Sequence, residues 1–230
     1  LTAGYRKSLG HNVIKFDPAS IEGSHVYNPL AEIRIGTGHV VEDCQNIALM
    51  IIDPDGKGLP DHWAKSGYQW LAVSVLHVLY RVKLTEKRNA NLRDVNRFMS
   101  AMPTEEDVFD DKDAVFEQVL DDMMAFDHQD KAIDDEVRRG ANSMKIKHGP
   151  ERTGVHSSAA IPLALYADPI VSGNIGHSDF RLDDLMNGEK PTALYIVIPP
   201  SDIDRLRPLI RILMNQFLKQ LTSKMEFGGG

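Results

Sequence analysis

The pair Gly56-Lys57 is the first pattern in the chain that suggests chemistry, because phosphate-binding loops end in glycine and lysine. Such a loop needs a second glycine five residues earlier and a serine or threonine directly after the lysine, so that backbone amides surround the phosphates. Ile51 and Gly58 occupy those two positions. The pair therefore predicts no nucleotide site, and we expect this chain by itself not to hydrolyse ATP.

The run Leu49–Asp53 offers a second nucleotide-related interpretation, since an apolar strand that ends in an acid can hold the shell of a Mg²⁺ ion. The residues before this run are spaced like a helix, however, and Pro54, Asp55 and Gly56 are typical of a turn. Asp53 is therefore only a minor candidate for a metal-shell acid.

Metal-binding and nucleophile motifs are absent from the sequence. The nine histidines include no H-x-x-x-H pair, Cys44 is the single cysteine, and no Gly-x-Ser-x-Gly elbow occurs. We assign no catalytic residue, no metal ligand and no cofactor to this chain. A single cysteine excludes an internal disulfide and fits a reducing compartment.

Two groups of side chains could instead bind a partner. Trp63, with Lys65 nearby, follows a Gly/Pro turn at a predicted helix start, where an indole could stack on a nucleic-acid base or simply pack on the end of a helix bundle. Arg93 and Arg97, with Arg88, belong to a short basic helix that could contact phosphates or only face solvent.

Acidic residues are concentrated between residues 104 and 139. This stretch has 14 acidic and 4 basic residues, a net charge of −10, whereas the whole chain has −7 and the remainder therefore +3. Such an acidic lobe repels nucleic acid and suits a basic protein partner, although a solvated helix face explains it equally. Glu105, Asp110 and Asp111 are its candidate partner-binding residues.

The spacing of apolar residues predicts helices through most of the middle of the chain. We expect helices over residues 39–52, 61–83, 91–102, from 104 onward, 130–148 and 152–165, the last kinked at Pro162. Residues 61–83 are apolar on nearly all sides, which predicts the centre of a bundle. Asn91 and Thr104 are expected to cap their helices.

The two ends of the chain have a different pattern. Val13, Ile14 and Phe16 indicate a short strand before Asp17-Pro18, and residues 178–185 indicate an edge segment and a turn. Residues 192–198 lack alternation, which predicts a strand buried on both faces of a parallel sheet. Ser201 is expected to cap a long helix with a buried stripe at Ile203, Leu206, Ile210, Leu213, Phe217 and Leu221.

The order of these elements predicts an α/β fold interrupted by an all-α insertion. The boundaries we expect are residues 1–36 and 176–230 for the α/β part and residues 37–175 for the inserted helical domain. The chain has no initiator methionine, no apolar run long enough for a membrane helix, and a glycine-rich end, so we expect a soluble internal piece of a longer protein.

Several short motifs, in order along nearly the whole chain, resemble the TraG-type coupling proteins of conjugative type IV secretion systems. They include Asp53-Pro54-Asp55-Gly56-Lys57-Gly58, Asp61-His62-Trp63 and Ser178-Asp179-Phe180. The others are the segments at residues 27–34 (YNPLAEIR), 43–48 (DCQNIA), 168–169 (DP) and 195–202 (YIVIPPSD), which leads into Arg205 and residues 208–211 (PLIR).

The resemblance implies a RecA-like P-loop fold with an all-α domain inserted in the motor domain. Such proteins are inner-membrane-anchored, homo-hexameric ATPases that use ATP and Mg²⁺. They link the relaxosome to the secretion channel and drive transfer of single-stranded DNA with its relaxase. Both Walker motifs of the family would lie outside this chain, which agrees with the mismatch of Gly56-Lys57 to a phosphate-binding loop. The piece alone could be monomeric.

Two hypotheses follow. In the first, the helical insertion recognises relaxosome proteins, chiefly the relaxase, or single-stranded DNA for a DNA-translocating ATPase that also contacts secretion channel proteins. In the second, the chain is a non-catalytic helical protein-interaction module with no role in DNA binding.

Overall fold

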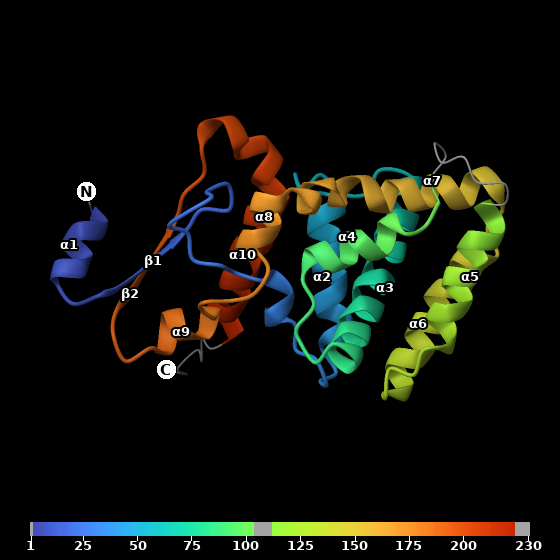
Figure 1. The fold of residues 1–230 in the computed structure, drawn as a ribbon, viewed down its shortest axis with the longest axis horizontal. Helices are drawn as coiled ribbons and strands as arrows, with labels where there is room; N and C mark the ends of the chain where they lie inside the picture. The colour runs from blue at the N-terminus through green and yellow to red at the C-terminus, as the bar shows by residue number, and fades with distance from the viewer. Residues whose placement is uncertain (1, 104–111, 224–230) are drawn as a thin grey trace, which may run out of the picture.

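The computed structural model describes residues 2–103 and 112–223, which form a small α/β part and a larger helical part (Figure 1). The α/β part contains α1 (Thr2–Ser8), β1 (Asn12–Phe16), the 3₁₀ turn η1 (Pro29–Glu32), α9 (Leu182–Asn187), β2 (Thr192–Ile196), the 3₁₀ turn η3 (Pro200–Asp202) and α10 (Ile203–Ser223). The helical part contains α2 (Val40–Ile52), α3 (His62–Thr85), α4 (Leu92–Ser100), α5 (Lys112–Ala125), α6 (Lys131–Lys145), α7 (Gly149–Ala160), η2 (Ile161–Ala167) and α8 (Pro169–Asn174).

The two described strands pair in parallel, as the sequence predicts, with Asn12 opposite Thr192 and Phe16 opposite Ile196. All helices from α2 to α9 lie between them in the sequence. The prediction that β2 is buried on both faces is wrong for the described chain, because all five of its residues are only half-buried. Within the described residues β2 pairs with β1 alone, so its other edge is not covered by a strand.

Helix α3 is the centre of the helical part, as its apolar sequence predicts. The Asp61 carboxylate caps its start by accepting a hydrogen bond of 2.8 Å from the backbone N–H of Ala64. The helix is buried almost continuously from Trp70 to Val82 and packs against α2, α4, α6 and α7. A helix enclosed on this many sides has no need of a polar face, which explains its composition.

The other predicted helices are confirmed with local changes, and the one predicted from residue 104 is confirmed over α5, since residues 104–111 lie outside the described chain. Asn91 caps α4 in a reciprocal capping box with Asp94, and Asp130 caps α6. Gly149 and Pro150 begin α7, because proline fits the first turn of a helix and lacks only an N–H that would be unpaired there. The predicted helix at residues 152–165 is instead α7 followed by η2, since Pro162 cannot continue the α-helical ladder.

Two predictions for the C-terminal part are wrong, and a third is confirmed only in part. Residues 182–187 form helix α9 where we expected an edge segment, with the Asp184 carboxylate accepting from the Arg181 N–H. Ser201 lies inside η3 and does not cap α10. The predicted buried stripe of α10 is confirmed at Leu206 and Leu213, which are fully buried, and Ile210 and Phe217 are half-buried against the core. Ile203 is instead half exposed, Leu209 and Ile212 are fully buried as well, and the side chain of Leu221 is not among those described. No helix among the described residues is both long and apolar enough to cross a membrane.

Candidate functional site

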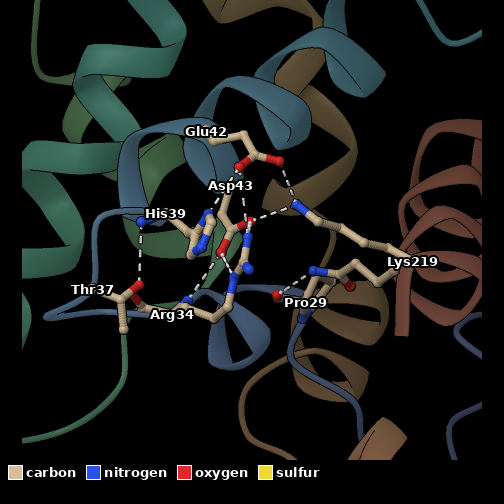
Figure 2. Close-up of polar contacts among 8 residues, drawn as sticks. Pro29, Arg34, Thr37, His39, Glu42, Asp43 and Lys219 are labelled. Atoms are coloured by element: carbon tan, nitrogen blue, oxygen red, sulfur yellow. Dashed lines mark hydrogen bonds and ion pairs between the residues drawn. The ribbon is translucent and has the colours of Figure 1, made fainter. Parts of the chain in front are cut away.

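The α/β part and the helical part meet at a junction of charged side chains between α10 and α2. Arg34, in the segment before α2, forms two hydrogen bonds with the Asp43 carboxylate, from Nε at 2.8 Å and from Nη2 at 2.7 Å. Lys219 of α10 reaches the same carboxylate at 3.0 Å and Glu42 at 2.8 Å (Figure 2). We call Arg34, Glu42, Asp43 and Lys219 the junction cluster.

Asp43 is the buried centre of the junction cluster, since its side chain is only 11% exposed. Burial alone would raise its pKa, but the hydrogen bonds from Arg34 and Lys219 outweigh burial and hold the pKa below its ordinary value. A carboxyl with a depressed pKa stabilises the fold above its unfolded pKa. This contribution is lost as the pH falls through the folded pKa, below about pH 4.

Replacing Asp43 by asparagine should therefore lower the free energy of unfolding at pH 7 by about 2 kcal/mol, because Arg34 and Lys219 lose their shared carboxylate. The measurement is urea unfolding followed by circular dichroism. Glu42→Gln is the matched control: this side chain is 53% exposed, so its loss should cost much less than the loss of Asp43. Equal effects of the two changes would contradict a central role for Asp43.

Three arginines nearer the N-terminal end of α10 also form contacts with the helical part. Arg205 pairs with Asp168 at the start of α8, at 2.7 Å, and Arg207 pairs with Asp55 in the turn after α2, at 2.5 Å. Arg211 donates to the backbone carbonyl of Asp53. One helix of the α/β part therefore holds α2 near both its ends and also the start of α8.

The turn at residues 53–58 is shaped for this contact. The Asp53 carboxylate accepts hydrogen bonds from the backbone N–H groups of Lys57, at 3.0 Å, and Gly58, at 2.8 Å. Gly56 has φ +72°, a backbone conformation that residues with a Cβ rarely adopt, so its conformation favours glycine. Asp53 follows a helix and closes a turn, and its position does not match the strand-end acid of a magnesium site.

An aromatic stack lies beside the charged junction. Tyr27 is fully buried, stacks on Phe180 with ring centroids 5.2 Å apart, and donates a hydrogen bond from its hydroxyl to Gln216 of α10 at 2.8 Å. Asn28 donates to the carbonyl of Ala90 at 2.8 Å. Residues of the sequence motifs near positions 27, 43, 55, 168 and 180 thus all make contacts at this junction. Their roles could not be predicted from the sequence, because these contacts join segments that are distant in the chain.

A cleft of about 280 Å³ opens between η1, α2, α9 and α10. Its charged lining residues are Glu32, Arg34, Asp43, Arg181, Asp183 and Lys219. Acidic and basic side chains in this lining form ion pairs with one another, as Arg181 does with Glu32 at 2.9 Å. Such an arrangement can fix the orientation of two parts of a protein, but it offers no nucleophile with an adjacent base.

The structure places Trp63 and Lys65 at the N-terminal end of α3. The Trp63 ring lies against Gly154 of α7, where a Cβ would be 2.7 Å from its Cζ3 atom, and 43% of the residue stays exposed. Lys65 is exposed. The indole therefore packs on the bundle end and still presents a face to solvent.

Arg93 and Arg97 are exposed on α4, which packs beside the C-terminal half of α3. Phe98 of α4 contacts His77, which is 14 residues after Trp63 in the sequence and thus about 21 Å farther along the helix axis. The structure does not bring the tryptophan and the arginines together. Arg88 is engaged within the chain, because it pairs with Asp94 at 2.7 Å and with Glu86 at 2.7 Å.

The candidates Glu105, Asp110 and Asp111, and the expected cap Thr104, lie outside the described residues. Elsewhere in the acidic lobe, some carboxylates have partners inside the protein. Asp113 and Glu117 pair with the buried Arg152, at 3.2 and 3.5 Å, and Asp121 pairs with Lys145 at 2.5 Å.

A metal centre is not apparent in the described part of the chain, where no three His, Cys, Asp or Glu side chains are grouped to hold an ion. Cys44 is 1% exposed, and burial raises the pKa of its thiol well above the ordinary range. A thiol in this state is a small core side chain.

Comparison with known proteins decides the family. The family model described as type IV secretory system conjugative DNA transfer matches residues 1–230. The chain belongs to this family. It is also 39% identical over 231 residues to the conjugal transfer protein TraG of Escherichia coli, covering the whole of this chain and 35% of that protein. The resemblance to TraG-type coupling proteins is thereby confirmed.

More distant relatives agree. The protein VirD4 of Rhizobium radiobacter is 27% identical over 223 residues, which are 96% of this chain and 29% of that protein. The chain thus spans about a third of the length of the curated coupling proteins that it matches. Among solved structures, the bacterial conjugative coupling protein TrwBdeltaN70, in a trigonal form in complex with sulphate, aligns with a TM-score of 0.50 at 17% identity, covering 96% of this chain and 48% of that one. This likeness shows a shared fold.

Proposed function

We propose that this chain is the part of a conjugative coupling protein that carries its substrate-recognition domain. In this proposal residues 37–175 are an inserted all-α domain, and residues 1–36 and 176–230 belong to a RecA-like motor domain. The main support is the parallel pairing of β1 with β2, because it joins into one sheet two strands that are separated in the sequence by the whole helical segment. The complete protein would link the relaxosome to the secretion channel and drive conjugative transfer of single-stranded DNA.

The surface of the small sheet supports an origin in a larger α/β domain. An apolar cleft of about 300 Å³ is lined by Leu185, Leu194, Ile196, Leu213, Met214 and Phe217. Two parallel strands are not stable as a sheet on their own. They need further strands beside them and other elements packed on both faces of the sheet. ATP and Mg²⁺ would be bound by parts of the protein outside this chain, in a homo-hexamer anchored in the inner membrane, with this piece on the cytoplasmic side.

Charge on the helical part supports two kinds of partner. Exposed basic side chains gather where α3 ends and α4 runs; they are Arg81, Lys83, Lys87, Arg93 and Arg97. Exposed acids lie on the α5–α6 hairpin, among them Asp122, Asp127 and Asp135. The basic end suits the phosphates of single-stranded DNA, and the acidic hairpin suits a basic relaxase or another relaxosome protein.

A salt-titrated binding assay tests the DNA contact, with a fluorescein-labelled oligothymidine of about 20 nucleotides as the probe. The double variant Arg93→Glu/Arg97→Glu should weaken binding at least about 10-fold and flatten the salt dependence, since each lost phosphate contact lowers the slope by about 0.7. Trp63→Ala should cost about 1–3 kcal/mol if the indole stacks on a base.

The charge-matched control is Lys7→Glu/Lys190→Glu, two exposed lysines of the α/β part. An equal loss of affinity in the control would show that only net charge matters, and unchanged affinity in all variants would remove the DNA contact. A lysine-rich peptide serves as the second probe. One outcome would identify the helical part as a protein-interaction module. In that outcome the peptide binds, Asp122→Lys/Asp135→Lys abolishes its binding, and DNA does not bind to any variant.

A further inference from the structure

A buried chain of three titratable side chains connects α3 to the α5–α6 hairpin. His77 of α3 lies with its Nδ1 2.9 Å from Nε2 of His128, which belongs to the loop between α5 and α6. The His128 Nδ1 lies 2.7 Å from Oδ1 of Asp134 on α6, and the His128 backbone N–H donates to the same oxygen at 3.1 Å. We call Asp134, His128 and His77 the histidine relay.

The hydrogen bonds of the relay fix the direction of its protons. An ionised carboxylate can only accept, so His128 donates from Nδ1 to Asp134. With both imidazoles neutral, Nε2 of His128 is then an acceptor, and His77 must donate to it from Nδ1. Asp134 thus supports His128 directly, whereas His77 has no carboxylate within the relay to stabilise a positive charge.

Aromatic rings surround the two histidines. His77 is 3% exposed and His128 1% exposed, and the His77 ring lies 5.3 Å from Phe98 of α4 and 5.6 Å from Phe126 of the hairpin loop, between ring centroids. Tyr80 of α3 faces His128, with 6.1 Å between ring centroids. Water is therefore excluded from the contact between the hairpin tip and α3.

The charged groups around the relay act unequally on its members. Arg81 on α3 opposes a positive charge on His77, Arg138 on α6 acts on Asp134, and Asp130 at the start of α6 acts on Tyr80. The described part of α4 contributes Phe98 to this contact. Burial, the neighbouring His128 and Arg81 together lower the pKa of His77 from 6.5 to about 3.

The hairpin tip has a strong preference for neutral His77. We propose that the histidine relay is a latch that acid releases: a proton taken up by His77 detaches the tip of the α5–α6 hairpin from α3, while the packing of α2, α3 and α7 is kept. A proton taken up at Nε2 of His77 would leave a buried cation enclosed by Phe98 and Phe126. Detachment of the tip lets water solvate this charge. This latch goes beyond the proposed function, because it concerns the attachment of the acidic hairpin whatever its partner.

The sign of the pH dependence follows from linkage. A base whose pKa is depressed in the closed state stabilises that state above its ordinary pKa of 6.5, and this stability is lost as the pH falls toward 3. Between pH 7 and pH 5, release of His77 into water should raise the opening equilibrium about 25-fold.

Hydrogen–deuterium exchange of the whole chain at pH 7 and pH 5, expressed as protection factors, tests the latch. In the unmodified chain, amides at residues 126–137 should lose about 25-fold in protection at pH 5, whereas amides at residues 70–76 of α3 should keep theirs. His77→Gln, which keeps a donor but does not titrate, should remove the pH dependence at the tip, and His77→Phe should do the same if the amide variant is poorly folded.

His62→Gln is the matched control, because His62 is an exposed histidine whose side chain is 58% accessible, and its variant should respond to pH like the unmodified chain. Equal protection of the tip at both pH values would overturn the proposal. So would an unchanged pH response in His77→Gln, or loss of protection in α3 together with the tip, which would mean global unfolding.

Discussion

Replacing Arg152 by methionine is expected to lower the free energy of unfolding by about 3 kcal/mol, the largest single effect that we predict. Arg152 is 2% exposed and donates to the backbone carbonyls of Lys145 and Lys147, at 2.9 Å each, near the C-terminal end of α6. Methionine keeps much of the packing over Phe116 but leaves both carbonyls without this donor, and an unpaired buried polar group costs about 1–3 kcal/mol.

Chemical denaturation at pH 7, followed by far-UV circular dichroism, measures this loss. Arg139→Met is the matched control, since the Arg139 side chain is 75% exposed and, among the described residues, pairs with Glu136 on the same helix; we expect a change below about 0.5 kcal/mol. Arg152 also pairs with Asp113 and Glu117, whose side chains are 59% and 48% exposed. A loss of less than about 1 kcal/mol for Arg152→Met would show that these ion pairs and the two carbonyl contacts contribute little.

Replacing Gly140 by alanine should destabilise the protein by about 2 kcal/mol, although alanine is the better helix former by about 1 kcal/mol. Gly140 lies on α6 where that helix crosses α3, and a Cβ there would be 2.5 Å from Cγ2 of Val73 and 2.6 Å from Cγ1. Two packed helices cannot separate at one point without losing neighbouring contacts, so overpacking costs typically about 1–3 kcal/mol.

A double-mutant cycle with Val73→Ala isolates this contact. Val73→Ala removes the two closest atoms and leaves only the Cβ of residue 73, 2.9 Å from the added methyl group, so Gly140→Ala should cost clearly less in this background. Gly173→Ala is the control, because Gly173 is an exposed helical glycine with nothing within 4 Å of its Cβ position, and it should not destabilise. An equal cost of Gly140→Ala in both backgrounds would contradict the steric explanation; unfolding free energies from urea titrations decide between them.

Helix positions were predictable where local interactions are sufficient. Asp61, Asn91 and Asp130 each bond backbone N–H groups within their own first turns, and the turn chemistry after Ile52 ends α2 as expected. The errors fall where a distant surface determines the outcome. Leu209 and Ile212 are buried on α10, a helix that packs against α2 and α9, and the sequence pattern alone is compatible with another stripe.

The candidate site followed the same division. Family membership could be predicted, because the short motifs occur in order along nearly the whole chain. The roles of Asp43, Asp55 and Asp168 could not, since their cationic partners Lys219, Arg207 and Arg205 are between 37 and 176 residues away. A charged residue has many complementary partners in a sequence, and only the packing of α10 across α2 selects one of them.

The sequence by itself determined the helical centre, the two strands, the missing phosphate-binding loop and the family, because these depend on local spacing and on short ordered motifs. Tertiary structure alone decided that the motif residues hold the two parts together, that Trp63 and Arg93 are far apart, and that His77 and His128 meet. These contacts depend on how buried helices cross, and burial makes them strong by removing water as a competing partner.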